Sequence, residues 1–213
     1  VPEITIQAFR LACDNVKEED FPLAFSDVVS SGRQDLVRGE TIFGWRQKME
    51  FNDQTQVVVQ RIAPQGQLRR VSVEQFQSSS RPAVLLVSDQ NCQIHQARII
   101  RYEDDVAVGL QPLNSALVAE GAEIPMNPSV PTGVDPGGMP VALVDSGVNY
   151  LLPEIQSRLA RESDGQLIGF DYWEMDDRPF DSHPARSVFF PQRHGTRTAS
   201  IILREASSAK ILP

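Results

Sequence analysis

The sequence contains no long apolar run and no cluster of basic residues. Its 213 residues carry a formal net charge of −8, with 12 Lys and Arg against 16 Asp and Glu in residues 1–120 and 8 against 12 in residues 121–213. Nucleic acid and anionic membranes attract clustered Lys and Arg, so neither is an expected partner. A transmembrane helix needs about 20 consecutive apolar residues, so no membrane span is expected.

Cysteine is also scarce, with Cys13 and Cys92 as the only two. In an exported protein they can form one disulfide that closes a long loop, whereas in the cytosol they are two buried thiols. The sequence leaves both arrangements open. The chain begins at Val1 and not at Met, which indicates removal of a signal peptide or a tag. We expect a secreted or periplasmic protein, with a cytoplasmic location as the alternative.

The composition is that of a soluble globular protein, but its pattern changes midway. Hydrophobic residues make up 41% of the chain and charged residues 23%. Residues 119–140 are rich in proline and glycine, which disfavour a packed helix or a central strand. We therefore predict a β-rich N-terminal domain over 1–118, a linker over 119–140 and a second domain over 141–213. A long surface loop within one domain is the alternative interpretation of 119–140.

The N-terminal part predicts strands and one helix. Two β-rich runs flank Pro64-Gln65-Gly66 within 55–76, which is typical of a hairpin, and 81–89 and 93–113 supply further strands. Residues 9–29 have helical apolar spacing interrupted at Pro22. His95 falls in a strand-like run with only Cys92 near it as a second ligand, so it is expected on the surface or on an edge strand.

The C-terminal part alternates between strand and helix patterns. Apolar residues 141–144 end at Asp-Ser-Gly and predict a buried strand, residues 150–162 have helical spacing, and 166–173 predict a second strand. A helix is expected to begin at His194, and 209–213 to start a third strand. This order predicts an α/β fold, a partial doubly wound parallel sheet, preceded by the smaller β-rich mixed α+β domain.

Two polar residues lie where such a sheet collects functional groups. Asp145 follows the first strand directly, and His194 opens its helix, followed by the small residues Gly195, Ala199 and Ser200 that allow close packing. Taken singly, Asp145 can merely end a strand or cap a helix, and His194 can be a helix-start histidine without a task. Taken together, in a strand and helix context, they indicate a site.

The two blocks resemble a known family. VALVDSGVNYLLPEI at 141–155 and HGTRTASII at 194–202 are similar to the Asp and His blocks of the subtilisin-like serine peptidases, and the resemblance covers residues 138–213. It implies that Asp145 orients and charge-stabilises the imidazole, and that His194 is the general base for a serine that attacks a protein or peptide substrate.

The chain departs from the family pattern within the His block and beyond it. Arg197, Thr198 and Ser200 replace the His, Val and Gly that the family often carries, and no Gly-Thr-Ser block occurs before Pro213. Ser146 is a poor substitute nucleophile because it adjoins Asp145 and is expected to point elsewhere.

These departures define the expected activity. The resemblance implies the N-terminal portion of a subtilisin-type serine endopeptidase whose serine lies in a remaining segment outside this chain, so the 213 residues alone are expected to be inactive. Residues 1–118 are then a prodomain or an accessory domain. The alternative is a non-catalytic interaction or scaffold protein that retains half of the fold.

The acidic stretch 170–184 is the remaining candidate site. Asp176, Asp177 and Asp181 are weak candidates for calcium, which prefers carboxylate and carbonyl oxygens, but their spacing matches no EF-hand loop and a solvated loop is the plainer interpretation. No other metal or cofactor is expected. His183 is expected on the surface, and Tyr172 and Trp173 either line a substrate groove or pack below it.

Overall fold

The computed structural model describes residues 1–78, 81–182, 189–190 and 193–213. The chain divides into two compact units: unit 1 comprises residues 1–101 and 110–123, and unit 2 comprises 102–109 and 124–213. His183 lies outside the described residues. Among the described helices, none combines the length and the apolar character required to cross a membrane.

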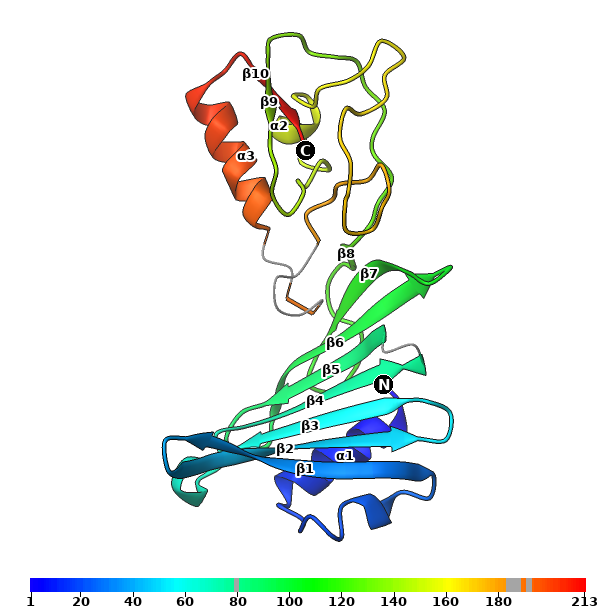
Figure 1. Cartoon of the computed structure of the whole chain (residues 1–213), viewed down its shortest axis with the longest axis vertical. Helices are drawn as coiled ribbons and strands as arrows, with labels where there is room; N and C mark the ends of the chain where they lie inside the picture. Colours follow the sequence, from blue (N-terminus) through cyan, green and yellow to red (C-terminus); the bar gives the residue numbers. More distant parts are fainter. Residues whose placement is uncertain (79–80, 183–188, 191–192) are drawn as a thin grey trace. The chain divides into compact units, whose positions relative to one another are not determined.

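Antiparallel strands dominate the structure (Figure 1). The sheet follows chain order, and neighbouring strands from β1 to β6 pair antiparallel. Its strands are β1 (Val28–Arg38), β2 (Thr41–Phe51), β3 (Gln56–Ile62), β4 (Arg70–Gln77), β5 (Arg81–Ser88), β6 (Ile94–Glu103), β7 (Val106–Leu113) and the two-residue β8 (Ile124–Pro125). Chain neighbours pair because short turns suffice to connect antiparallel strands.

The hairpin expected within 55–76 is confirmed. Gln56 pairs with Phe76 and Ile62 with Arg70, and the 3-10 turn η2 (Pro64–Gly66) lies in the connection. Along β4, Val71 and Val73 are buried while Ser72 and Glu74 are not, as the two-residue period of a strand requires. His95 is exposed on β6, on the surface as expected.

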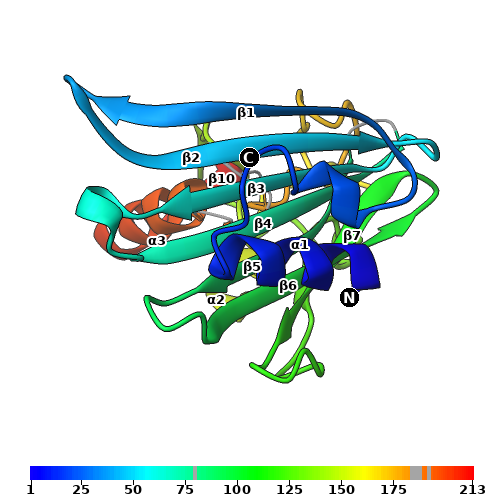
Figure 2. The same cartoon turned by 90° about the horizontal axis from the view of Figure 1, so that it is seen from below.

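One helix packs on this sheet (Figure 2). In α1 (Glu3–Cys13) the buried residues are Thr5, Ala8, Phe9 and Ala12, a single helical stripe. The expected helix over 9–29 is wrong in its extent. Asn15 adopts φ 54°, the left-handed conformation that asparagine tolerates, so the helix ends before it. The short turn η1 (Pro22–Ala24) then precedes β1.

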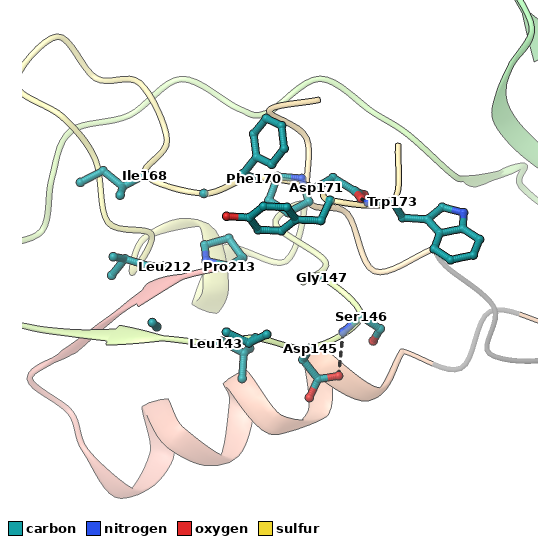
Figure 3. Close-up of a pocket in the computed structure, with 15 residues that line it drawn as sticks. Leu143, Asp145, Ser146, Gly147, Ile168, Phe170, Asp171, Trp173, Leu212 and Pro213 are labelled. Carbon is teal, nitrogen blue, oxygen red and sulfur yellow. Dashed lines mark hydrogen bonds between the residues drawn. The ribbon is translucent and has the colours of Figure 1, made fainter. Parts of the chain in front are cut away.

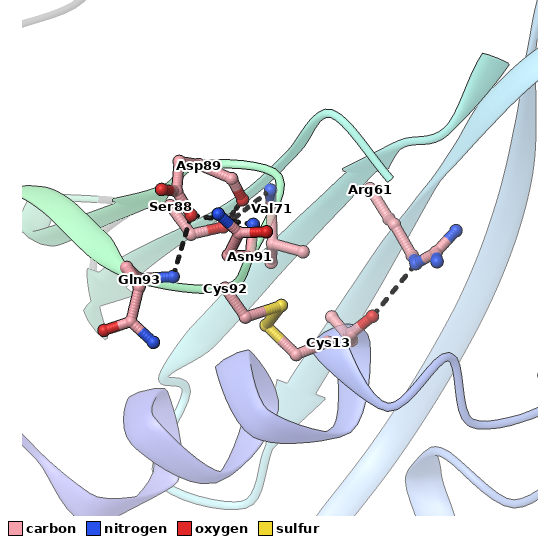
Figure 4. Close-up of a disulfide and its surroundings, with 9 residues drawn as sticks. Cys13, Arg61, Val71, Ser88, Asp89, Asn91, Cys92 and Gln93 are labelled. Carbon is pink, nitrogen blue, oxygen red and sulfur yellow. Dashed lines mark hydrogen bonds between the residues drawn. A yellow bond between two sulfur atoms is a disulfide. The ribbon is translucent and has the colours of Figure 1, made fainter. Parts of the chain in front are cut away.

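A disulfide fastens α1 to the sheet (Figure 4). Cys13, the last residue of α1, bonds to Cys92 in the turn between β5 and β6, across a sequence separation of 79 residues. Both cysteines pack against the core cluster of unit 1. Of the two arrangements that the sequence left open, the structure has the bridge.

Unit 2 does not contain the predicted doubly wound parallel sheet. Among its described strands, parallel pairing over several residues joins β9 (Met139–Ala142) to β10 (Ala209–Leu212), and the other described parallel contacts are single bridges. The helix predicted over 150–162 is reduced to α2 (Pro153–Gln156), and 166–173 is not a strand. The predicted α/β class is therefore wrong, since the molecule is mostly antiparallel β.

Local hydrogen bonds explain both differences. Beyond α2, Arg158 donates its side chain to Ala209 O and the backbone N–H of Ala160 donates to Ile211 O, so this stretch lies along β10 instead of continuing the helix. In 166–173, Asp171 Oδ1 accepts from the N–H of Trp173 and of Glu174. Such a side-chain turn replaces the extended backbone that a strand needs.

The proline-rich stretch 124–140 belongs to unit 2 and is fixed there by polar contacts. Asp135 pairs with Lys210 at 2.8 Å and accepts from the N–H of Arg161 at 2.9 Å. Tyr150 donates its hydroxyl to Pro128 O at 2.5 Å. The stretch is thus held against the β9 and β10 region by side chains, because proline supplies no backbone donor.

Candidate active site

Asp145 lies three residues after β9, where the chain turns sharply. Leu143 N–H still donates to Leu212 O of β10, and Gly147 then adopts φ +88°. A Cβ on Gly147 would lie 2.6 Å from Pro179 O, so only glycine fits this turn. The turn directs the Asp145 side chain toward α3 (His194–Glu205) and away from Phe170 (Figure 3).

His194, the first residue of α3, meets that carboxylate. Its Nδ1 lies 2.8 Å from Asp145 Oδ1 and 2.9 Å from Oδ2. The contact expected between two residues 49 positions apart is confirmed. Thr198 Oγ1 lies 3.3 Å from Asp145 Oδ2 and donates to His194 O at 3.1 Å, so this departure from the family pattern supports the same pair.

The pair is asymmetric in exposure. The side chain of His194 is 71% exposed, whereas that of Asp145 is 15% exposed. Desolvation raises the pKa of Asp145, but hydrogen bonds from His194 and from Ser146 N–H outweigh it, and the net pKa lies below its ordinary value. The carboxylate is therefore ionised at neutral pH and acts as the acceptor for the imidazole.

Small residues let α3 approach this turn. A Cβ on Gly195 would lie 2.1 Å from Gly147 O, and Ala199 is fully buried. Around them is the core cluster of unit 2, whose buried members are Val148, Tyr150, Ile155, Leu159, Phe180, Ala199 and Ile211. Ser200, expected to affect helix packing, is exposed and donates to Thr196 O at 2.9 Å, so it does not face this core.

Ser146 and Asp181 form a second polar contact beside the pair. Ser146 Oγ donates to Asp181 Oδ1 at 2.7 Å and accepts from Gly195 N–H at 3.0 Å. Ser146 Oγ is therefore engaged by Asp181 and Gly195, and the described hydrogen bonds of the His194 ring do not include it. Asp181 Oδ2 accepts from Thr196 N–H at 2.7 Å. The sequence did not identify this role, because Asp181 is far from the start of α3 in sequence and no local signal marks it as a helix cap.

The calcium candidates do not gather. Asp181 is occupied at the start of α3, and Asp176 accepts from Asn127 Nδ2 and pairs with Arg178. Within the described residues, no group of three or more His, Cys, Asp or Glu side chains is placed to hold a metal ion.

A cavity of about 610 Å³ adjoins the site on the side away from α3 (Figure 3). Tyr172 and Trp173, expected in a groove or beneath it, line this cavity and are 82% and 72% exposed. Its remaining lining residues are Ala142, Leu143, Val144, Asp145, Ser146, Gly147, Ile168, Gly169, Phe170, Asp171, Pro179, Leu212 and Pro213.

In the described part of the chain, the imidazole of His194 hydrogen-bonds to Asp145 alone. The arrangement can hold an imidazole and accept a proton at Nε2, but no described serine contacts it. Comparison with family models, curated proteins and solved structures gave no match to this chain.

Proposed function

We propose that this chain supplies the aspartate and the histidine of a subtilisin-type serine endopeptidase, whose nucleophilic serine lies in a segment outside these 213 residues. The observation that carries the proposal is the hydrogen bond from His194 Nδ1 to both carboxylate oxygens of Asp145. An ionised carboxylate at Nδ1 makes Nδ1 the protonated nitrogen and leaves Nε2 as the acceptor. This is the tautomer that a general base requires.

In the proposed reaction the serine Oγ attacks the carbonyl carbon of the peptide bond, and its proton passes to His194 Nε2. The same proton then passes to the leaving amine as the C–N bond breaks, which leaves an acyl-enzyme. Water attacks the ester carbonyl carbon and gives a proton to Nε2, and this proton then passes to the serine Oγ as the ester C–O bond breaks, which releases the acid and the free serine. Asp145 stays ionised and stabilises the imidazolium in both steps.

The surface beside the site supports a contribution from outside. Val144, which precedes Asp145, is 99% exposed, and the aromatic side chains of the same cavity, Tyr172 and Trp173, are exposed as well. Exposed apolar side chains that share one cavity are typical of a surface that binds another molecule, including a polypeptide. A segment bound there lies next to Asp145.

The test is labelling with a fluorophosphonate, which reacts with an activated serine. The full-length gene product is compared with its His194→Ala and Asp145→Asn variants, and His95→Ala serves as the control because His95 is exposed on β6. We expect the labelling rate to fall by about 10³-fold or more in both site variants, because triad members act as a unit. Equal labelling of wild type and His194→Ala overturns the proposal.

The second candidate is a non-catalytic interaction protein. It is favoured by the absence, among the described serines, of any hydrogen bond to His194. A folded full-length product that takes up no label supports this candidate and removes the peptidase.

The disulfide supports a location in an oxidising compartment, secreted or periplasmic. Alkylation of unreduced protein taken directly from its source tests this: we expect Cys13 and Cys92 to be protected until a reductant is added. Modification of both cysteines before reduction indicates the cytosol.

A further inference from the structure

The start of α3 carries no cap of its own. Its N-cap residue is Arg193, which makes no side-chain capping bond and adopts φ 54°. The first N–H groups of a helix have no partner within the helix and need one elsewhere. Here Gly195 N–H donates to Ser146 Oγ at 3.0 Å, and Thr196 N–H donates to Asp181 Oδ2 at 2.7 Å.

Asp181 joins these two bonds into one unit. It is only 2% exposed, and its second oxygen accepts from Ser146 Oγ at 2.7 Å. One buried carboxylate therefore holds the turn after β9 and the first turn of α3 at once. A negative charge at a helix N-terminus is favourable, and a hydrogen bond to a charged group is stronger than a neutral one.

Asp181 and its hydrogen bonds to Ser146 and Thr196 form a clamp between the turn after β9 and the start of α3. This clamp adjoins the proposed catalytic pair. Ser146 follows Asp145 directly, and Gly195 follows His194 directly. Thr196 Oγ1 adds a further bond by accepting from Asn149 N–H at 2.8 Å. A shift of α3 along the turn would therefore change the Asp145 to His194 distance, whereas intact bonds fix it.

We propose that Asp181 is a positioning residue that, acting through Ser146 and the first turn of α3, holds His194 in the geometry and tautomer set by Asp145. The inference rests on the proposed function for its meaning in catalysis, but its geometric content concerns this chain alone. Asp181 touches neither the imidazole nor any reacting atom.

The test reads the His194 ring by ¹⁵N-detected NMR of the 213-residue chain, with its signals assigned from His194→Ala. In wild type we expect Nδ1 to carry the proton. In Asp181→Ala we expect the ratio of the Nδ1–H to the Nε2–H tautomer to fall about fivefold, which corresponds to about 1 kcal/mol, the usual loss of a helix cap.

Three further variants sharpen the result. Ser146→Ala removes only the linking hydroxyl and is expected to change the ratio in the same direction, which keeps the test valid if Asp181→Ala fails to fold. Asp181→Asn retains an acceptor for Thr196 N–H and should restore part of the ratio. Asp164→Ala is the matched control, because Asp164 accepts from Gln166 N–H in an exposed turn.

A wild-type ratio in folded Asp181→Ala or in Ser146→Ala overturns the inference, since a merely structural role would lower stability and leave the tautomer unchanged. The fluorophosphonate labelling experiment tests the proposed peptidase separately from the positioning role of Asp181. Unlabelled wild type with the expected tautomer shift removes the peptidase and retains the clamp, whereas labelled wild type with unchanged tautomers does the reverse.

Discussion

Different kinds of bond stabilise unit 1 and unit 2 internally. In unit 1 neighbouring strands of seven to eleven residues pair through their backbones, and a disulfide ties α1 to them. The longest described strands that lie wholly in unit 2 have four residues, and side chains hold the intervening loops. Asp135, Asn149 and Asp171 each accept from a backbone N–H there. Because unit 2 has less backbone pairing between strands, single polar side chains matter more to its fold.

Removal of the disulfide is expected to give the largest difference in stability change between the two units. In the double variant Cys13→Ala and Cys92→Ala, the free energy of unfolding of unit 1 should fall by about 4.5 kcal/mol, because the bridge spans 79 residues of sequence. Denaturant unfolding followed by the emission of the buried Trp45 measures it.

Amide exchange in α3 of the same variant gives the comparison, since unit 2 contains neither cysteine. An unchanged Trp45 midpoint, or an equal loss of protection in α3, would show that the bridge does not act on unit 1 selectively.

The difference between the units also explains what sequence reasoning could reach. The 55–76 hairpin was predicted because its turn and its alternation are local, and they alone set the pairing of Gln56 with Phe76. The helix at His194 was predicted for the same reason, from small and apolar residues within one segment. The contact between Asp145 and His194 was predicted through a resemblance, not from spacing.

One error has a local cause, and the others lie where groups far apart in sequence decide the structure. Residues 166–173 have the composition of a strand, but the Asp171 carboxylate binds the following N–H groups and bends the chain. The second half of the helix predicted over 150–162 lies along β10 instead, because Ala160 N–H donates a hydrogen bond to Ile211 O. Asp181 caps α3 and is not the calcium ligand that the acidic stretch predicts, and nothing in its neighbourhood in sequence shows the start of α3.

A substitution of intermediate effect tests close packing in unit 2. In Gly195→Ala the new Cβ would lie 2.1 Å from Gly147 O, so α3 must move away from the turn. We expect the free energy of unfolding of unit 2 to fall by about 2–3 kcal/mol, as it does at overpacked sites. Measurements are amide exchange in α3 and the His194 ring signals, which should show the loss of the Asp145 contact.

Gly32→Ala is the control for this change, because a Cβ on Gly32 in β1 of unit 1 meets nothing within 4 Å. It should leave both units nearly unchanged. Equal losses from the two alanines would mean that backbone entropy, and not the approach of α3 to Gly147, determines the cost.

The smallest effect concerns acid. Hydrogen bonds from Arg161 N–H, Lys210 Nζ and Gly137 N–H hold the pKa of Asp135 at about 2, against an ordinary value of 3.8. A depressed carboxyl pKa means that the unfolded chain binds the proton more tightly, so the contribution to stability is complete above pH 3.8 and is lost as the pH falls through about 2.

The variant Asp135→Asn tests this contribution, because its amide cannot titrate. The free energy of unfolding of unit 2 in wild type should therefore exceed that of the variant at neutral pH, and the difference should shrink across this window. A difference independent of pH would show that Asp135 acts through its shape and hydrogen bonds alone, and that the contrast between side-chain bonding in unit 2 and backbone bonding in unit 1 does not extend to charge.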